Sequence, residues 1–142
     1  EEEVRLAQVA KELMEKAAFQ YGHSQALVQL GNEALELAEK TEEGEMAAEK
    51  IHKAMELYKR AGSAEAWFNL GNLLWNGYPP RDQETNDTAP SIVLQQDKES
   101  ALEAFQNAID LGDVDSMYFV GVQYLSQEGD PSKAQKGLDL VL

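Results

Sequence analysis

Residue types that could perform catalysis or hold a metal are sparse in this sequence. Cysteine is absent, which excludes thiolate nucleophiles, thiolate metal ligands and structural disulfides. The two histidines, His23 and His52, lack neighbours in the His-Glu-x-x-His spacing with which a helix holds zinc. No serine is followed three residues later by the lysine that a penicilloyl-serine site requires. We therefore expect a chain that is not an enzyme and that has no cofactor and no metal.

Three carboxylates, those of Asp110, Asp113 and Asp115, lie close together in the sequence. A calcium-binding loop would also need a downstream glycine and glutamate, and both are missing. Asp113 stands directly before an apolar helical pattern, where a carboxylate caps the first turn of a helix. We therefore expect Asp113 to be a helix cap and not a metal ligand.

The charge of the chain narrows the classes of partner. The 26 acidic and 12 basic residues give a formal net charge of -14, which repels phosphate backbones and anionic lipid headgroups. Residues 1–60 carry 13 acids and 8 bases, whereas residues 61–142 carry 13 acids and 4 bases. Nucleic acid and membrane surfaces are therefore not expected as partners, and a basic ligand would favour the second part.

Three stretches of the sequence can be aligned, at residues 22–32, 62–72 and 112–122. Each begins with a glycine that is followed nine residues later by another, at Gly31, Gly71 and Gly121. The spacing between stretches is 40 and then 50 residues. A period of this length is typical of repeat proteins, in which each unit buries its apolar face against its neighbours.

The apolar pattern within these units is helical throughout. Apolar residues at three- and four-residue spacing predict helices over about 4–21, 24–40, 46–61, 64–76, 98–111 and 114–127. Gly22, Gly62 and Gly112 mark helix ends. Gly31, Gly71 and Gly121 fall inside helices, where glycine costs about 1 kcal/mol relative to alanine. We expect the second helix of each unit to approach the backbone closely at these three positions.

The domain organisation follows from the same alignment. Residues 1–142 form one helical-repeat domain, in which 1–22 is the second helix of a preceding repeat, 23–62 and 63–112 are repeats, and 113–142 is an incomplete repeat with a last helix from Asp130. We expect the chain to be part of a longer protein. Residues 78–96 are a polar, proline-containing loop inserted in the middle repeat. Asn86 in this loop starts an Asn-x-Thr glycosylation tripeptide, which also arises often by chance.

The middle unit resembles a known family. The run from Ala64 to Gly77, Ala-Glu-Ala-Trp-Phe-Asn-Leu-Gly-Asn-Leu-Leu-Trp-Asn-Gly, looks like the first helix of a tetratricopeptide-type repeat. The spacing of Ala101, Phe105 and Ala108 resembles the second helix, and the close at Gly112 is nearer to the Sel1-like branch of this superfamily. The resemblance implies an all-α fold, a right-handed α/α solenoid of antiparallel helix pairs.

In Sel1-like repeats a stripe on the first helix of each unit faces the concave groove. The resemblance places aliphatic, aromatic, amide and acidic side chains there, and aromatic rings beside asparagines suit the capture of a segment of another chain. Packing between the repeats is the alternative for Phe68, Trp75 and Tyr118, whereas Trp67 is expected in the core. The predicted groove residues are Val28, Asn32, Leu35, Glu65, Phe68, Asn72, Trp75, Tyr118, Val122 and Leu125.

The function that the resemblance implies is that of a scaffold or adaptor, which binds a protein or peptide segment, of basic character, in this groove. The alternative is a regulatory or targeting arm of a larger enzyme such as a kinase, as in an elongation-factor kinase that ends in Sel1-like repeats. No apolar run is long enough for a membrane span, and no basic segment precedes an apolar one as in a signal peptide. The sequence does not fix the compartment, and an intracellular one is favoured.

Overall fold

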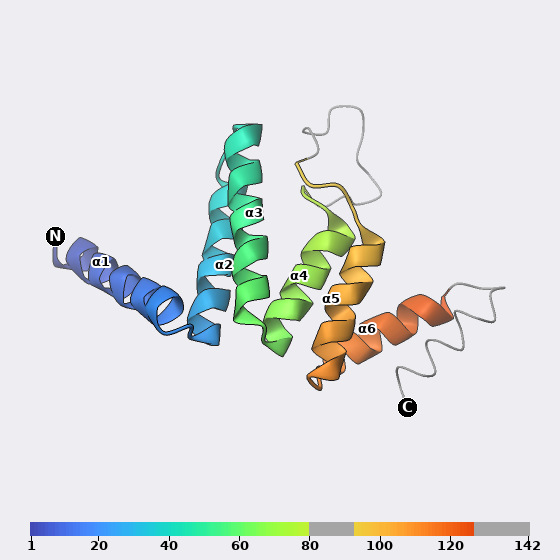
Figure 1. Cartoon of the computed structure of the whole chain (residues 1–142). Helices are drawn as coiled ribbons and strands as arrows, with labels where there is room; N and C mark the ends of the chain where they lie inside the picture. Colours follow the sequence, from blue (N-terminus) through green and yellow to red (C-terminus); the bar gives the residue numbers. More distant parts are fainter. Residues whose placement is uncertain (80–92, 127–142) are drawn as a thin grey trace.

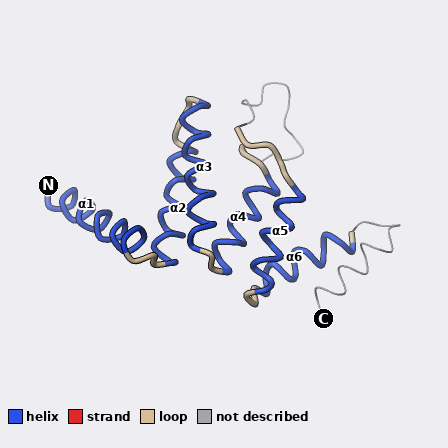
Figure 2. The backbone as a smooth tube through the Cα atoms, viewed as in Figure 1, coloured by secondary structure: helices blue, strands red, loops and turns tan. Residues whose placement is uncertain are grey.

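The computed structural model of the chain describes residues 1–79 and 93–126. These residues form six α-helices and one π-helical segment, and helices pack in sequential pairs (Figure 1, Figure 2). The fold class is all-α, as predicted. Each helix predicted within the described residues is found, with ends within two residues of the prediction, except that the end of the first becomes a π-helical segment. The elements are α1 (Glu2–Glu15), η1 (Lys16–Gln20), α2 (Ser24–Glu39), α3 (Gly44–Ala61), α4 (Ala64–Asn76), α5 (Lys98–Asp110) and α6 (Val114–Leu125).

Four of the helices begin with a side-chain cap. The residue before the helix extends a nitrogen or oxygen acceptor to the backbone N–H three residues on, which would otherwise lack a partner. Asp113 does this to Ser116 at 2.9 Å, so its predicted role as a cap is confirmed. The equivalent hydrogen bond at the start of α5 lowers the pKa of Asp97, because the Ser100 N–H stabilises the carboxylate. The four bonds start helices α2, α4, α5 and α6 and involve His23, Ser63, Asp97 and Asp113.

The glycines predicted at helix ends have backbone angles that favour glycine. Gly22, Gly62 and Gly112 have φ angles of 65°, 64° and 89°. A side chain is strained in this left-handed region, whereas glycine enters it freely. The prediction that these three residues separate the helices is confirmed.

The mid-helix glycines lie under aromatic rings of the next helix. A methyl group added at Gly31 on α2 would lie 2.7 Å from Cε1 of Tyr58 on α3. At Gly71 on α4 it would lie 2.6 Å from Cδ1 and Cε1 of Phe105 on α5. The predicted close approach is confirmed for these two pairs. Gly121 is buried on α6, and the helix predicted to approach it lies outside the described residues.

The two described pairs share one register. On α3, the buried residues around the ring are Ala54, Leu57, Tyr58 and Ala61, and the same spacing on α5 gives Ala101, Ala104, Phe105 and Ala108, all buried. The small side chains let the helices approach while the ring fills the space over the glycine. A continuous hydrophobic core runs from Ala18 in η1 to Val120 in α6. The packing is therefore repeat-like.

The polar insertion is closed at its base. The Tyr78 N–H donates to the Leu94 carbonyl at 2.8 Å, and the N–H of Leu94 returns to the Tyr78 carbonyl at 3.0 Å. These bonds hold the two ends of the insertion together beside the end of α4. The central part of the predicted 78–96 loop, with the Asn86 tripeptide, and the helix predicted from Asp130 lie outside the described residues.

Helix α1 projects from the paired helices (Figure 1) and buries none of its side chains. Its leucines and valines are exposed, with 67% of Leu6, 44% of Val9 and 63% of Leu13 accessible. The chain turns onto the core only at η1, where Ala18 is fully buried. None of the described helices is both long and apolar enough to cross a membrane.

The contact between Gly71 and Phe105 makes the fold sensitive to a single methyl group. We expect Gly71→Ala to lower the free energy of unfolding by about 1 to 3 kcal/mol, because Phe105 is fully buried and its ring has no room to move. Helix propensity alone would make the alanine variant about 1 kcal/mol more stable than the parent. A fall in the free energy of unfolding would therefore come from the contact with the Phe105 ring. Denaturant unfolding followed by circular dichroism measures it.

Gly44→Ala is the matched control, because Gly44 is also helical and has open space around it. We expect this variant to be as stable as the parent or slightly more so. Equal stability of the two alanine variants would show that the ring does not restrict the backbone at Gly71.

Candidate binding groove

An open groove of about 450 Å³ lies between α2 and α4, the first helices of two successive pairs. Tyr58 of α3 lies in its wall, and Tyr78 follows α4 at one end. The groove exists because the second helix of the first pair spaces the two first helices apart. Its lining residues are Asn32, Leu35, Glu39, Tyr58, Glu65, Asn69, Asn72, Leu73, Asn76, Gly77 and Tyr78.

The polar lining of the groove is made of amides and carboxylates. Asn32 reaches it from α2, and Asn69, Asn72 and Asn76 reach it from α4. Each asparagine amide offers two N–H donors and one oxygen acceptor. Glu39 and Glu65 add two carboxylates, and no lysine or arginine is among the lining residues. The groove is therefore acidic and rich in groups that match the polar atoms of a peptide backbone.

Tyr58 connects the groove to the core. Its side chain is fully buried, and its hydroxyl donates to Oδ1 of Asn32 at 2.5 Å. Nδ2 of Asn69 lies 3.4 Å from the same oxygen, so one amide joins α2, α3 and α4. Burial, and then the charge of Glu65, raise the pKa of Tyr58 to about 12. The phenol is therefore neutral and holds the Asn32 amide in a fixed orientation.

A second tyrosine closes the end of the groove. Burial, and then the charge of Glu39, raise the pKa of Tyr78 above its ordinary value. Its backbone forms the bridge to Leu94. Both tyrosines in the groove therefore remain protonated at neutral pH, and each hydroxyl can donate a hydrogen bond.

Four of the predicted groove residues are brought together in this site. They are Asn32, Leu35, Glu65 and Asn72. Val28, predicted beside them, is instead fully buried in the hydrophobic core. A side chain with no accessible surface cannot touch a partner, so Val28 supports the groove from behind.

The predicted aromatic residues of α4 pack away from the groove. The Phe68 ring lies 5.9 Å from the Phe105 ring, and the Trp75 ring meets Phe119 edge-on at 5.2 Å. Both side chains are half-buried against the core, and Nζ of Lys98 lies 4.9 Å from the Trp75 ring. The Trp75 contact joins two helix pairs, as in the packing alternative, whereas the Phe68 contact lies within the α4–α5 pair.

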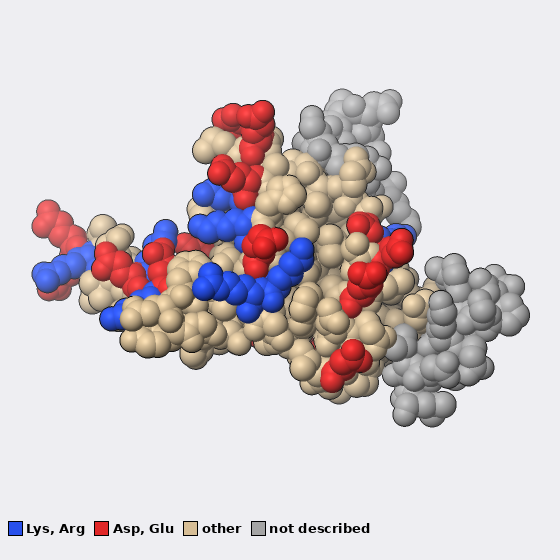
Figure 3. All heavy atoms as spheres, in the orientation of Figure 1, with Lys and Arg blue, Asp and Glu red and all other residues tan. Residues whose placement is uncertain are grey.

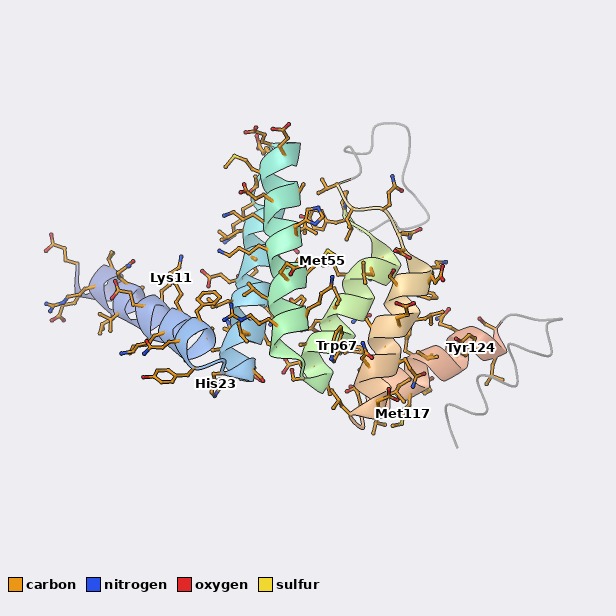
Figure 4. The ribbon with its side chains drawn as sticks, viewed as in Figure 1. Lys11, His23, Met55, Trp67, Met117 and Tyr124 are labelled. Atoms are coloured by element: carbon orange, nitrogen blue, oxygen red, sulfur yellow. The ribbon has the colours of Figure 1, made fainter. Side chains whose placement is uncertain are left out.

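The three predicted residues of α6 lie elsewhere on the surface. Tyr118, Val122 and Leu125 are 76%, 41% and 59% accessible, and none lines the groove between α2 and α4. Trp67, expected in the core, packs against it from α4, as does Met55 from α3 (Figure 4).

The sequence prediction missed two groove asparagines, Asn69 and Asn76. The signal was present, because Glu65, Asn69, Asn72 and Asn76 follow one another at spacings of four, three and four and so lie on one helix face. Alignment on the aromatic rings selected the neighbouring face, with Phe68 and Trp75. The polar face of α4 is the one that the structure opens.

The described residues contain no group of three or more histidine and acidic side chains arranged to hold a metal ion. His23 has a structural contact, in which its Nδ1 accepts the Ala26 N–H at 3.2 Å (Figure 4). His52 is exposed on α3.

The two described helix pairs repeat the same glycine and ring contact with the same spacing of buried residues. No protein-family model, curated protein or solved structure matches the sequence or the fold.

The raised pKa of Tyr58 predicts a loss of stability in alkali. The unfolded phenol ionises near pH 10, whereas the folded one keeps its proton to about 12. The stabilisation is therefore complete below pH 10 and is lost as the pH rises toward 12. Tyr58→Phe should weaken this pH dependence and, at neutral pH, cost about 1 kcal/mol for the lost bond to Asn32. Denaturant unfolding across this pH range measures both effects.

Tyr118→Phe provides the comparison, because it removes the hydroxyl of an exposed tyrosine. We expect its stability to follow the parent at every pH. If the two variants lost stability in alkali alike, ionisation of Tyr58 would not be coupled to folding.

Proposed function

We propose that this chain is a Sel1-like helical-repeat scaffold, built as a right-handed α/α solenoid, that binds a segment of a partner protein. The repeated contact of a glycine with a ring supports the repeat assignment, since it recurs at the same place in successive pairs. The residues of the middle unit resemble that family over both of its helices. In this proposal the described pairs are successive units of one stack.

The observation that carries the binding proposal is the convergence of four asparagines in one open groove. A bound peptide loses water from its own N–H and C=O groups, and each must find a partner. Side-chain amides supply both donors and acceptors to such groups. The Asn32 amide is already oriented by Tyr58, so less conformational entropy is lost when it binds.

The spacing of the asparagines suits an extended chain. Along α4, Asn69, Asn72 and Asn76 are separated by rises of about 4.5 and 6 Å, at 1.5 Å per residue. An extended peptide repeats its backbone groups on one side about every 6.8 Å. The rise of about 6 Å between Asn72 and Asn76 is close to this repeat, so these two amides are spaced to meet alternate backbone groups of a segment that runs along α4. The apolar Leu35 and Leu73 offer contacts for its side chains.

The charge of the groove favours a basic segment. Glu39 and Glu65 face the space that the segment would occupy, in a chain with a net charge of -14. Lysine or arginine side chains of the partner would pair with these carboxylates, and the field of the whole chain would speed their encounter. Binding, and not catalysis, is the activity proposed.

Selection from a random peptide library displayed on phage tests this proposal. We expect enriched peptides to contain lysine or arginine and to bind the purified chain in fluorescence anisotropy. Asn69→Ala combined with Asn72→Ala should weaken that binding about ten-fold, as expected for two lost hydrogen bonds. Glu65→Lys should weaken the basic peptides further, because it reverses one of the two carboxylate charges.

Asn107→Ala is the matched control, since Asn107 is an exposed asparagine on α5 away from the groove. We expect no change in peptide affinity for this variant. If the control and the double variant bound the peptides with equal affinity, the groove would not be the binding site. Failure of the library to enrich any peptide would count against segment binding as the function.

A further inference from the structure

Five cations gather at the junction of α1, η1 and α3, and we call these five residues the cationic patch: Lys11, Lys50, Lys53, Lys59 and Arg60. Figure 3 shows lysines and arginines grouped over these helices, whereas the face over α5 carries carboxylates. In a chain with only 12 basic residues and a net charge of -14, this is a local reversal of charge.

The cationic patch surrounds two adjoining hollows, of about 50 Å³ and 570 Å³. Lys53 and Phe19 line both of them, so the hollows meet at this pair of side chains. Lys11 and Lys50 border the first hollow, and Lys59 and Arg60 border the second. The surface is therefore shaped as well as charged.

An exposed aromatic ring lies at the centre of the cationic patch. Phe19 is 44% accessible, although it belongs to η1 and adjoins the core residue Ala18. The Arg60 guanidinium lies 5.4 Å from the centre of its ring, and Nη2 of Arg60 donates to the Phe19 carbonyl at 3.4 Å. These contacts hold the ring and the cation together, and they leave part of the ring accessible to a partner.

The carboxylates within the hollows do not cancel the cations. Glu15 and Glu33 line the first hollow and Glu56 lines the second, where it lies 3.9 Å from Nζ of Lys59. Five cations against three carboxylates leave a net charge of +2. An anionic ligand would therefore gain attraction here and meet repulsion over most of the chain.

We propose that the cationic patch binds a short acidic segment of a partner protein, with an apolar side chain of that segment on Phe19. The extent of the patch decides between classes of anion. Outside the patch, on the same helices, the first turns of α1 and α3 carry glutamates: Glu2, Glu3 and Glu45. A nucleic acid duplex carries one charge about every 1.7 Å along its axis, so it would extend from the patch onto this acidic surface. A short acidic peptide ends within the patch.

This surface is separate from the groove, and the inference does not depend on the function proposed for the groove. On α2, the groove is lined by Asn32, Leu35 and Glu39, whereas Glu33 and Leu37 line the hollow of the cationic patch. These two sets point in opposite directions around the helix. One chain would thus hold an acidic segment on one side and a basic segment on the other.

Fluorescence anisotropy with a short fluorescein-labelled peptide of glutamates and aspartates around one tryptophan tests this inference. We expect saturable binding to the full chain that weakens with salt, since the contacts are electrostatic. Lys53→Glu should weaken it about ten-fold. Lys40→Glu changes the net charge equally at an exposed lysine outside the patch and should change the affinity less than about two-fold. Phe19→Ala should lower the affinity about three-fold with an unchanged salt dependence.

Several outcomes would overturn the inference. One such outcome is that the acidic peptide does not bind. Another is that Lys53→Glu and Lys40→Glu reduce its binding equally, which would show that the affinity depends on the net charge of the chain and not on the patch. Tighter, Lys53-dependent binding of a DNA duplex or of anionic phospholipid vesicles would assign the patch to that class of ligand. Self-association that Lys53→Glu abolishes in sedimentation would assign it to a second copy. Circular dichroism confirms folding, and Lys53→Gln replaces the glutamate variant if that variant is unfolded.

Discussion

In two helix pairs of this fold, an aromatic ring of one helix packs against the backbone of the other. With no Cβ at Gly31 or Gly71, the rings of Tyr58 and Phe105 lie directly on the helix backbone. Such a contact fixes how far each helix pair slides and rotates, because a packed ring leaves no free volume. In the first pair the ring also ends in a hydroxyl that orients Asn32. The contact that packs the core therefore also positions the groove.

The sequence predicted the helices, their ends and the two glycine contacts, because each depends on local chemistry or on a repeated spacing. It did not predict which face of α4 opens. Phe68 and Asn69 are neighbours in the sequence, and the choice between them depends on other helices, because the Phe68 ring packs on Phe105 of α5 and the Trp75 ring on Phe119 of α6. The resemblance predicted Val28 in the groove as part of the first-helix stripe, whereas its burial depends on the packing of neighbouring helices. Faces that depend on a distant helix are hard to infer from one sequence.

The charges of the chain are arranged more finely than its net charge suggests. The net charge of the whole chain is -14, yet the cations of α3 collect with Lys11 around a single ring. Helix α2 separates this region from the amides and carboxylates of the groove, because residues at different helical phases face different neighbours. Composition therefore bounds the behaviour of the whole molecule, whereas local selectivity comes from how helices divide their faces.

The π-helical segment η1 determines where the apolar stripe of α1 points. A π-helical turn accommodates one residue more than an α-helical turn, and each residue turns an α-helix by about 100°. Without that additional residue, Leu6 and Leu13 would come to the angular positions that Ala7 and Met14 now hold, and of these two Met14 packs against the core. An insertion of a single residue thus sets the phase of a whole helix, and it leaves Leu13 exposed one position away from Met14, which packs against the core.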